Sequence, residues 1–131
     1  MCSRVLFISG RRSDARLLSG MLHELPLTLN HVPSLRQART NLYLEEYDVI
    51  LTEAALPDGK WLDVLHLVRE SPQETQVIIT DPQADAQFWS EALNLGAYDL
   101  LAQPFYEPEV RRILSNACSR ALPQSLTMAA V

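Results

Sequence analysis

The chain has 131 residues, a formal net charge of −5 at pH 7 and a pI near 5.1, as expected for one acidic domain that repels nucleic-acid phosphates. Its two cysteines, Cys2 and Cys118, lie at opposite ends without a partner motif, which predicts neither a disulfide framework nor a metal site. No apolar run approaches the roughly 20 residues of a membrane span, and no signal-peptide core follows residues 1–4, so we expect a cytoplasmic protein without a membrane partner.

Five short apolar runs alternate with amphipathic stretches along the chain, which predicts a parallel sheet with helices on both faces. The first, third and fourth runs are almost wholly apolar, as is typical of central strands that are covered on both sides. The second run, LTLNHV, alternates in polarity and is expected at an edge. The expected strands are Arg4–Ile8, Leu27–Val32, Asp48–Thr52, Gln76–Thr80 and Tyr98–Ala102.

The first two helices are indicated by capping residues and by apolar residues at helical spacing. Ser13 and Asp14 are positioned to cap the first helix. Ser34 and Gln37 form the capping-box pattern of the second. The residues expected to face the core are Leu17, Leu18, Met21, Leu22 and Leu25 in the first helix, and Leu35, Ala38 and Leu42 in the second.

Three further helices are delimited by helix-ending residues, namely Pro72, Gly96 and Pro123. The expected ranges are Lys60–Glu70, Ala84–Leu95 and Glu107–Ala121. Residues 123–131 carry no charge and no periodic pattern, so we expect them to form a frayed end or the start of a linker after a domain of residues 1–122.

Three stretches of the sequence together resemble the receiver domain of bacterial two-component response regulators. They are YDVILTEAALPDG, the VIIT strand end and GAYDLLAQPF, and the resemblance extends over about residues 4–121. It implies a flavodoxin-like α/β fold with a five-stranded parallel sheet of order 2-1-3-4-5 and helices on both faces.

The resemblance also implies a phosphorylation site, because the family transfers a phosphoryl group from a histidine kinase to an aspartate. The family's site consists of an acidic pair that holds Mg²⁺, the acceptor aspartate, a hydroxyl, an aromatic switch residue, and a lysine before a proline. In this chain these positions fall on Ser9 and Gly10, Glu53, Thr80, Leu100, and Gln103 with Pro104, respectively.

Only the hydroxyl and the proline are retained, which changes the functional prediction. Divalent cations are held through carboxylates, so we expect no Mg²⁺ site where Ser9 and Gly10 replace two acids. A phosphoryl group in transfer needs a cation and donors around it. The sequence therefore predicts an atypical receiver that is not an enzyme, has no cofactor and binds proteins without a normal phosphorylation cycle. The glycine-rich motifs of nucleotide and flavin sites do not occur.

The role of Glu53 has two readings at this stage. It is either a strand-end carboxylate that pairs with a nearby arginine, or a permanent imitation of a phosphorylated aspartate, although one negative charge is a poor copy of phosphate. Because the first and third strands are neighbours in this fold, we expect Arg11 or Arg12 to pair with Glu53, together with the Thr80 hydroxyl.

We expect such a domain to act through a protein-binding surface. In the family the fourth helix, fifth strand and fifth helix form the dimer or output face, which corresponds here to about residues 84–95 and 98–121. We expect a protein partner or fused output domain, and a weak homodimer. The candidate interface residues are Phe88, Trp89, Tyr98, Tyr106, Arg111 and Arg112. Two alternatives stay open: a phosphoreceiver that uses non-standard residues, and a small-molecule-binding flavodoxin-like domain.

Overall fold

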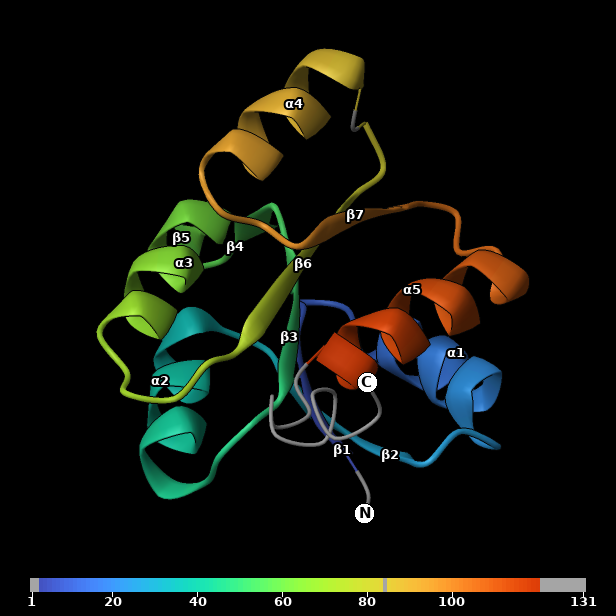
Figure 1. Ribbon diagram of the computed structural model, residues 1–131, viewed down its shortest axis with the longest axis horizontal. Coiled ribbons are helices and arrows are strands. Elements are labelled where there is room, and N and C mark those ends of the chain that lie inside the picture. Colours follow the sequence, from blue (N-terminus) through green and yellow to red (C-terminus); the bar gives the residue numbers. More distant parts are fainter. Residues whose placement is uncertain (1–2, 84, 121–131) are drawn as a thin grey trace, which may run out of the picture.

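The structure is a computed structural model that describes residues 3–83 and 85–120. Its centre is a parallel five-stranded sheet in the order β2-β1-β3-β6-β7, which is 2-1-3-4-5 when only these strands are counted along the chain (Figure 1). The predicted fold class is therefore confirmed, with β2 at the expected edge. The strands are β1 (Ser3–Ile8), β2 (Leu27–Val32), β3 (Val49–Glu53), β6 (Gln76–Asp81) and β7 (Asp99–Ala102).

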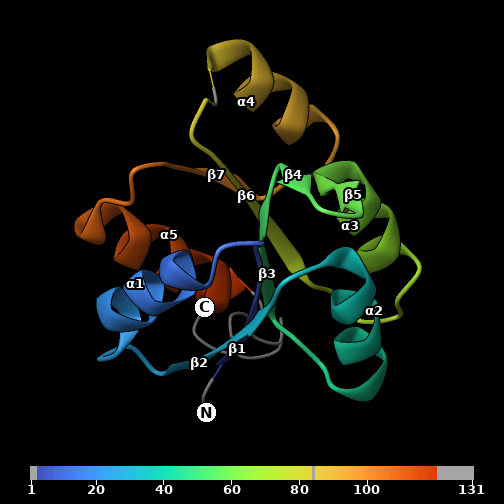
Figure 2. The ribbon, with the colours of Figure 1, turned by 180° about the vertical axis from the view of Figure 1, so that it is seen from behind.

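Helices cover both faces of this sheet, as Figures 1 and 2 show from opposite sides. One buried cluster joins the sheet to α1 (Arg12–Leu22) and α5 (Glu107–Arg120). The other joins it to α2 (Leu35–Leu44), α3 (Trp61–Arg69) and α4 (Ala86–Asn94). The central strands bury side chains on both faces, which explains why they read as continuous apolar runs.

The start of α1 differs from the sequence prediction. Helix α1 begins at Arg12, and its N-cap residue Arg11 makes no side-chain cap. Ser13 and Asp14 lie in the first helical turn, so the predicted capping role is wrong for both. The helix buries Leu18 and leaves Leu17 48 % exposed, although both were expected to face the core.

The other helix boundaries follow the prediction to within one or two residues. Asp85 is the N-cap of α4, and its carboxylate accepts a hydrogen bond from the Phe88 amide at 2.8 Å. The predicted first residue of this helix, Ala84, lies outside the described residues, as do Ala121 and the predicted linker 123–131. No helix of the described chain is long and apolar enough to cross a membrane.

A short antiparallel hairpin follows β3 and was not predicted. It pairs β4 (Ala55–Leu56) with β5 (Gly59–Lys60) around the turn at Asp58. The Asp58 carboxylate accepts hydrogen bonds from the amides of Leu35 at 2.8 Å and Arg36 at 2.9 Å. These two bonds, that from Arg36 first, hold the pKa of Asp58 below its usual value. The turn beside the candidate site is thereby fastened to the start of α2.

Candidate functional site

The residues singled out in the sequence meet at the carboxyl ends of the central strands. The strand register pairs Ile8 with Thr52, and Glu53 with Thr80, so the loops after β1, β3 and β6 lie at one edge of the sheet. A cleft of about 510 Å³ opens there, at the place where open α/β sheets bind ligands. Among the residues that line it are Gly10, Arg11, Glu53, Thr80, Asp81 and Gln103.

Glu53 is held by the backbone of the loop after β1. Its Oε1 accepts a hydrogen bond from the Gly10 amide at 2.9 Å. The predicted ion pair is wrong, because neither Arg11 nor Arg12 approaches Glu53 within 4.0 Å in the described residues. Both arginines are exposed at the start of α1. An exposed ion pair gains little free energy and orders two long side chains, whereas the Gly10 amide is already fixed.

The Thr80 hydroxyl points into the sheet rather than toward Glu53, which overturns the second half of that prediction. Thr80 is fully buried and donates to the Leu101 carbonyl at 2.7 Å. The side-chain amide of Gln103 donates to the same hydroxyl oxygen at 3.0 Å. Thr80 and Gln103 are therefore bonded to each other where the family has a hydroxyl and a lysine. The peptide bond between Gln103 and Pro104 is cis.

The loop after β1 is closed by its own hydrogen bonds. The Ser9 side chain is buried, and its hydroxyl accepts from the Arg11 amide at 3.0 Å. The Ser9 carbonyl lies 2.7 Å from Nε2 of His31, on the neighbouring strand β2. These contacts fix the position of the adjacent Gly10 amide, which in turn holds Glu53.

The Mg²⁺ ion that the receiver fold implies does not fit these residues. Gly10 has no side chain, and the Ser9 hydroxyl is directed to the Arg11 backbone. The second carboxylate of the cleft, Asp81, accepts a hydrogen bond from the Gln83 amide at 3.0 Å. No group of three or more His, Cys, Asp or Glu side chains in the described chain is arranged to hold a metal ion. Magnesium requires several oxygen ligands near octahedral geometry, and two carboxylates that already accept hydrogen bonds from backbone amides do not supply them.

Leu100, at the position of the aromatic switch residue, is 5 % exposed and belongs to the core shared with α2, α3 and α4. Nearby, Trp61 packs edge-on against Phe88, with ring centroids 5.8 Å apart. Phe88 is therefore partly buried, which makes it a packing residue of α4 rather than a free contact for a partner.

The other candidate interface residues divide into two groups. Tyr98 packs against the core below α1 and α5, and Arg111 reaches the Met21 carbonyl at 3.1 Å, so both are engaged within the domain. Trp89 and Tyr106 are 47 % and 65 % exposed, respectively, and Arg112 is exposed as well. The outward-facing set on this side is thus smaller than predicted.

Comparison with known sequences assigns this chain to a protein family. Residues 5–115 match the family model of the response regulator receiver domain. The response regulator PilR of Pseudomonas aeruginosa is 25 % identical over 122 residues, which are 93 % of this chain and 27 % of PilR. The regulatory protein LuxO of Vibrio cholerae is 29 % identical over 109 residues, 83 % of this chain and 24 % of LuxO. The chain spans about a quarter of the length of these curated relatives.

Solved structures agree on the fold. The signal receiver domain of a LuxO repressor protein from Vibrio parahaemolyticus superposes with a TM-score of 0.89 at 24 % identity, covering 97 % of this chain and 98 % of that domain. The beryllofluoride-activated NtrC4 receiver domain dimer gives a TM-score of 0.83 at 23 % identity, covering 91 % and 98 %. The fold is that of a receiver domain. The chain belongs to the response regulator receiver domain family, as the sequence motifs indicated.

Proposed function

We propose that this domain is an atypical receiver, a signalling module that acts through protein–protein contacts in the cytoplasm without a cycle of aspartate phosphorylation. The observation that carries the proposal is that the polar groups of the cleft are bonded to one another. Glu53 accepts from Gly10, and Thr80 is held between Leu101 and Gln103.

Phosphoryl transfer requires groups that these bonds do not leave available. The charge on a transferring phosphoryl group is stabilised by a divalent cation and by positively charged or hydroxyl donors. Here the Thr80 hydroxyl proton is directed to a carbonyl, and the neutral Gln103 amide stands at the lysine position. Binding rather than catalysis is the function that this arrangement supports.

The contact between Glu53 and Gly10 also counts against the phosphoryl-imitation reading of Glu53, while the arginine pair of the other reading is not formed. A phosphoryl imitation would direct its oxygens toward Thr80, whereas Oε1 of Glu53 lies against the backbone of the loop after β1. In our proposal Glu53 is a tie between β3 and that loop, and it keeps the domain in a single state.

The proposal predicts that Mg²⁺ with acetyl phosphate or beryllofluoride leaves the protein unchanged. A ligand that binds only the folded state raises the melting temperature, so thermal unfolding with and without Mg²⁺ and beryllofluoride should give the same midpoint. Intact-mass measurement after treatment with acetyl phosphate should show no added phosphoryl group. A receiver domain with the acidic pair, aspartate and lysine serves as the positive control. A Mg²⁺-dependent rise in midpoint, or a phosphorylated species at Glu53, would refute the proposal.

We also propose a weak homodimer through the surface of α4, β7 and α5, alongside a protein partner or a fused output domain. The NtrC4 neighbour is described as a receiver domain dimer, and this surface of the present chain exposes Trp89 and Tyr106. Sedimentation velocity over rising concentration should show reversible dimerisation that Trp89→Ala or Tyr106→Ala weakens. Leu17→Ala, at an exposed site on α1, is the control. A monomer at all concentrations would count against the dimer.

A further inference from the structure

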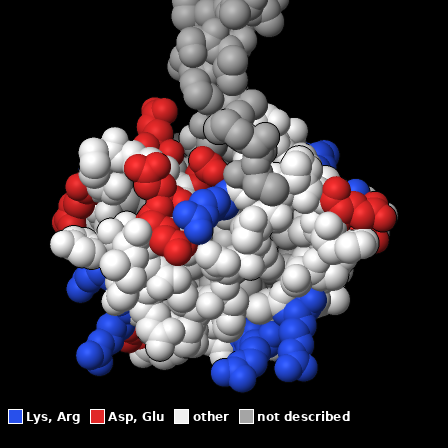
Figure 3. Space-filling view, turned by 90° about the horizontal axis from the view of Figure 1, so that it is seen from below, with Lys and Arg blue, Asp and Glu red and all other residues white. Residues whose placement is uncertain are grey.

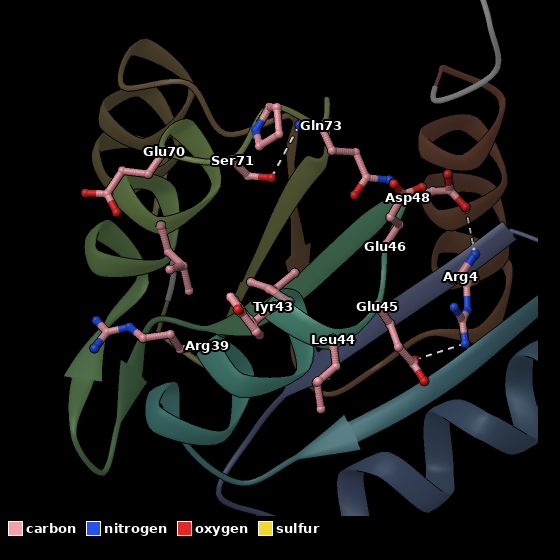
Figure 4. Close-up of a pocket in the computed structure, with 13 residues that line it drawn as sticks. Arg4, Arg39, Tyr43, Leu44, Glu45, Glu46, Asp48, Glu70, Ser71 and Gln73 are labelled. Carbon is pink, nitrogen blue, oxygen red and sulfur yellow. Dashed lines mark hydrogen bonds and ion pairs between the residues drawn. The ribbon is translucent and has the colours of Figure 1, made fainter.

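A second hollow lies at the amino ends of the strands, on the opposite side of the domain from Glu53. It has a volume of about 850 Å³ and lies where α2 and α3 end and where β1 and β3 begin. Figure 4 shows Tyr43 near its middle, with Glu70 and Ser71 on one side and Arg4, Glu45 and Asp48 on the other. We call this hollow the α2–α3 groove.

The groove carries exposed apolar surface on its α2 side. Leu35 and Ala38 are the buried residues of α2 and face the core. The last turn of the helix carries two large apolar residues, Tyr43 and Leu44, that do not face the core. Tyr43 is 90 % exposed and Leu44 is 71 % exposed. Both side chains line the same hollow, so they present apolar surface to one ligand, which is more informative than the same residues scattered singly.

The same groove is negatively charged. Arg4 forms an ion pair with Glu45 at 2.9 Å, and its amide donates to Asp48. Glu46 and Glu70 make no ion pair with any residue that the structure describes. Figure 3, which views the molecule from this side, shows acidic side chains gathered around a basic one. Arg39 also lines the groove, so its charged lining is four acids (Glu45, Glu46, Asp48 and Glu70) and two bases, with a net charge of −2. A cationic ligand would therefore find Glu46 and Glu70 without ion-pair partners.

The ends of two helices add to this negative potential. The last turn of α2 contains no basic residue, and its C-cap residue is Glu45. Helix α3 ends at Arg69, but the guanidinium of Arg69 donates to the Leu95 carbonyl and so is turned toward the end of α4. The C-terminal end of a helix carries partial negative charge and is stabilised by nearby cations. The chain leaves that stabilisation incomplete at the groove.

From these observations we infer that the α2–α3 groove binds a basic segment of a partner protein. An apolar side chain of that segment packs on Tyr43 and Leu44, and its lysines or arginines face Glu46 and Glu70. An arginine can also stack on the Tyr43 ring. Because Tyr43 stays 90 % exposed, the groove does not enclose a small molecule, which is normally buried over most of its surface. Nucleic acids and anionic lipid surfaces carry the wrong charge.

This inference goes beyond the proposed function and does not depend on it. The groove lies at the amino ends of the strands, whereas the Glu53 cleft lies at their carboxyl ends. A response to Mg²⁺ or beryllofluoride would refute the atypical receiver and would not affect the inference about the groove. A failure of basic peptides to bind the groove would refute the inference and would not affect the atypical receiver.

The test is selection of a randomised peptide library on the folded protein, followed by fluorescence anisotropy with the labelled winning peptide. We expect winning sequences in which lysines or arginines flank an aromatic or aliphatic residue, with an affinity that falls as salt rises. Tyr43→Ala and the pair Glu46→Lys, Glu70→Lys should each weaken binding about tenfold or more.

Matched variants separate the groove from overall charge. Tyr106→Ala removes an exposed tyrosine that does not line the groove, 65 % exposed against 90 % for Tyr43, and the pair Glu91→Lys, Glu107→Lys makes the same charge change on α4 and α5. Both should bind the peptide as the unmodified protein does. Circular dichroism confirms folding of every variant. Winning peptides without basic residues, equal losses in the two charge pairs, or self-association of the free protein that Tyr43→Ala abolishes would overturn the inference.

Discussion

A variant with Ser9→Asp, Gly10→Asp, Glu53→Asp and Gln103→Lys is expected to bind Mg²⁺ and to accept a phosphoryl group, neither of which we expect of the unmodified chain. The four changes supply the carboxylates and the cation that the family site uses, around the retained Thr80. The backbone has room for a side chain at Gly10, because a Cβ there would lie 3.7 Å from the nearest atom, Cγ of Pro57. A Cβ at Gly10 is therefore in ordinary van der Waals contact with its neighbours.

Thermal unfolding gives the expected size of this effect. At a Mg²⁺ concentration ten times the dissociation constant, binding stabilises the folded state by about 1.4 kcal/mol. For a domain of this length that corresponds to a rise of about 5 °C in melting temperature. Treatment with acetyl phosphate should then add one phosphoryl group, which intact-mass measurement detects. A variant that carries only Ser9→Asp and Gly10→Asp should gain no phosphoryl group.

Glu53→Asp alone is the matched control and should gain neither property, because the carboxylates after β1 and the lysine are still absent. If the fourfold variant folds but does not respond to Mg²⁺, then these four residues are not the reason why the unmodified chain binds no Mg²⁺. In the same variant Gln103→Lys removes the hydrogen bond from the Gln103 amide to the Thr80 hydroxyl, and the lysine directs its charge to the phosphoryl oxygens instead.

The fold was predictable because it depends on features that the sequence carries directly. The apolar runs that end at Ile8, Thr52 and Thr80 form the three central strands, and such short runs between turn residues are typical of strands that are buried on both faces. Their carboxyl ends meet at one edge by topology alone, so the sequence was sufficient to bring Ser9, Glu53 and Thr80 together.

The contacts within the cleft were not predictable in the same way. Glu53 pairs with the backbone amide of Gly10, and a backbone amide has no side-chain signal in a sequence. The nearby arginines, Arg11 and Arg12, are conspicuous in the sequence, yet both side chains are exposed and neither pairs with Glu53. The Thr80 hydroxyl donates to the Leu101 carbonyl, and this choice of partner depends on a side-chain rotamer that no sequence pattern encodes. The tie from Asp58 to α2 is likewise long-range, although Pro57-Asp58-Gly59 is itself a typical turn sequence.

Helix α1 shows that the spacing of apolar residues predicts a helix but does not decide which of its residues are buried. Leu17 and Leu18 both belong to an apolar stripe by spacing, yet Leu18 is fully buried and Leu17 is 48 % exposed. A helical stripe is wide enough to include both, and only the approach of α5 and the sheet decides which one is covered. Leu18 lies in the cluster that also contains Phe7 and Leu114.

We therefore expect Leu18→Ala to lower the free energy of unfolding by about 2–5 kcal/mol, a large part of the roughly 5–15 kcal/mol of a typical domain. Leu17→Ala, one residue away in the same helix, should change it by no more than about 0.5 kcal/mol, because the leucine is half exposed and alanine favours helix slightly more. Urea unfolding of both variants measures the difference, with equal slopes as the sign that the unfolded states match. The two substitutions share helix, residue type and position in the chain, so their difference isolates burial. Similar losses in both would mean that Leu17 is covered in solution, and that the exposed side of α1 is an interface of the domain.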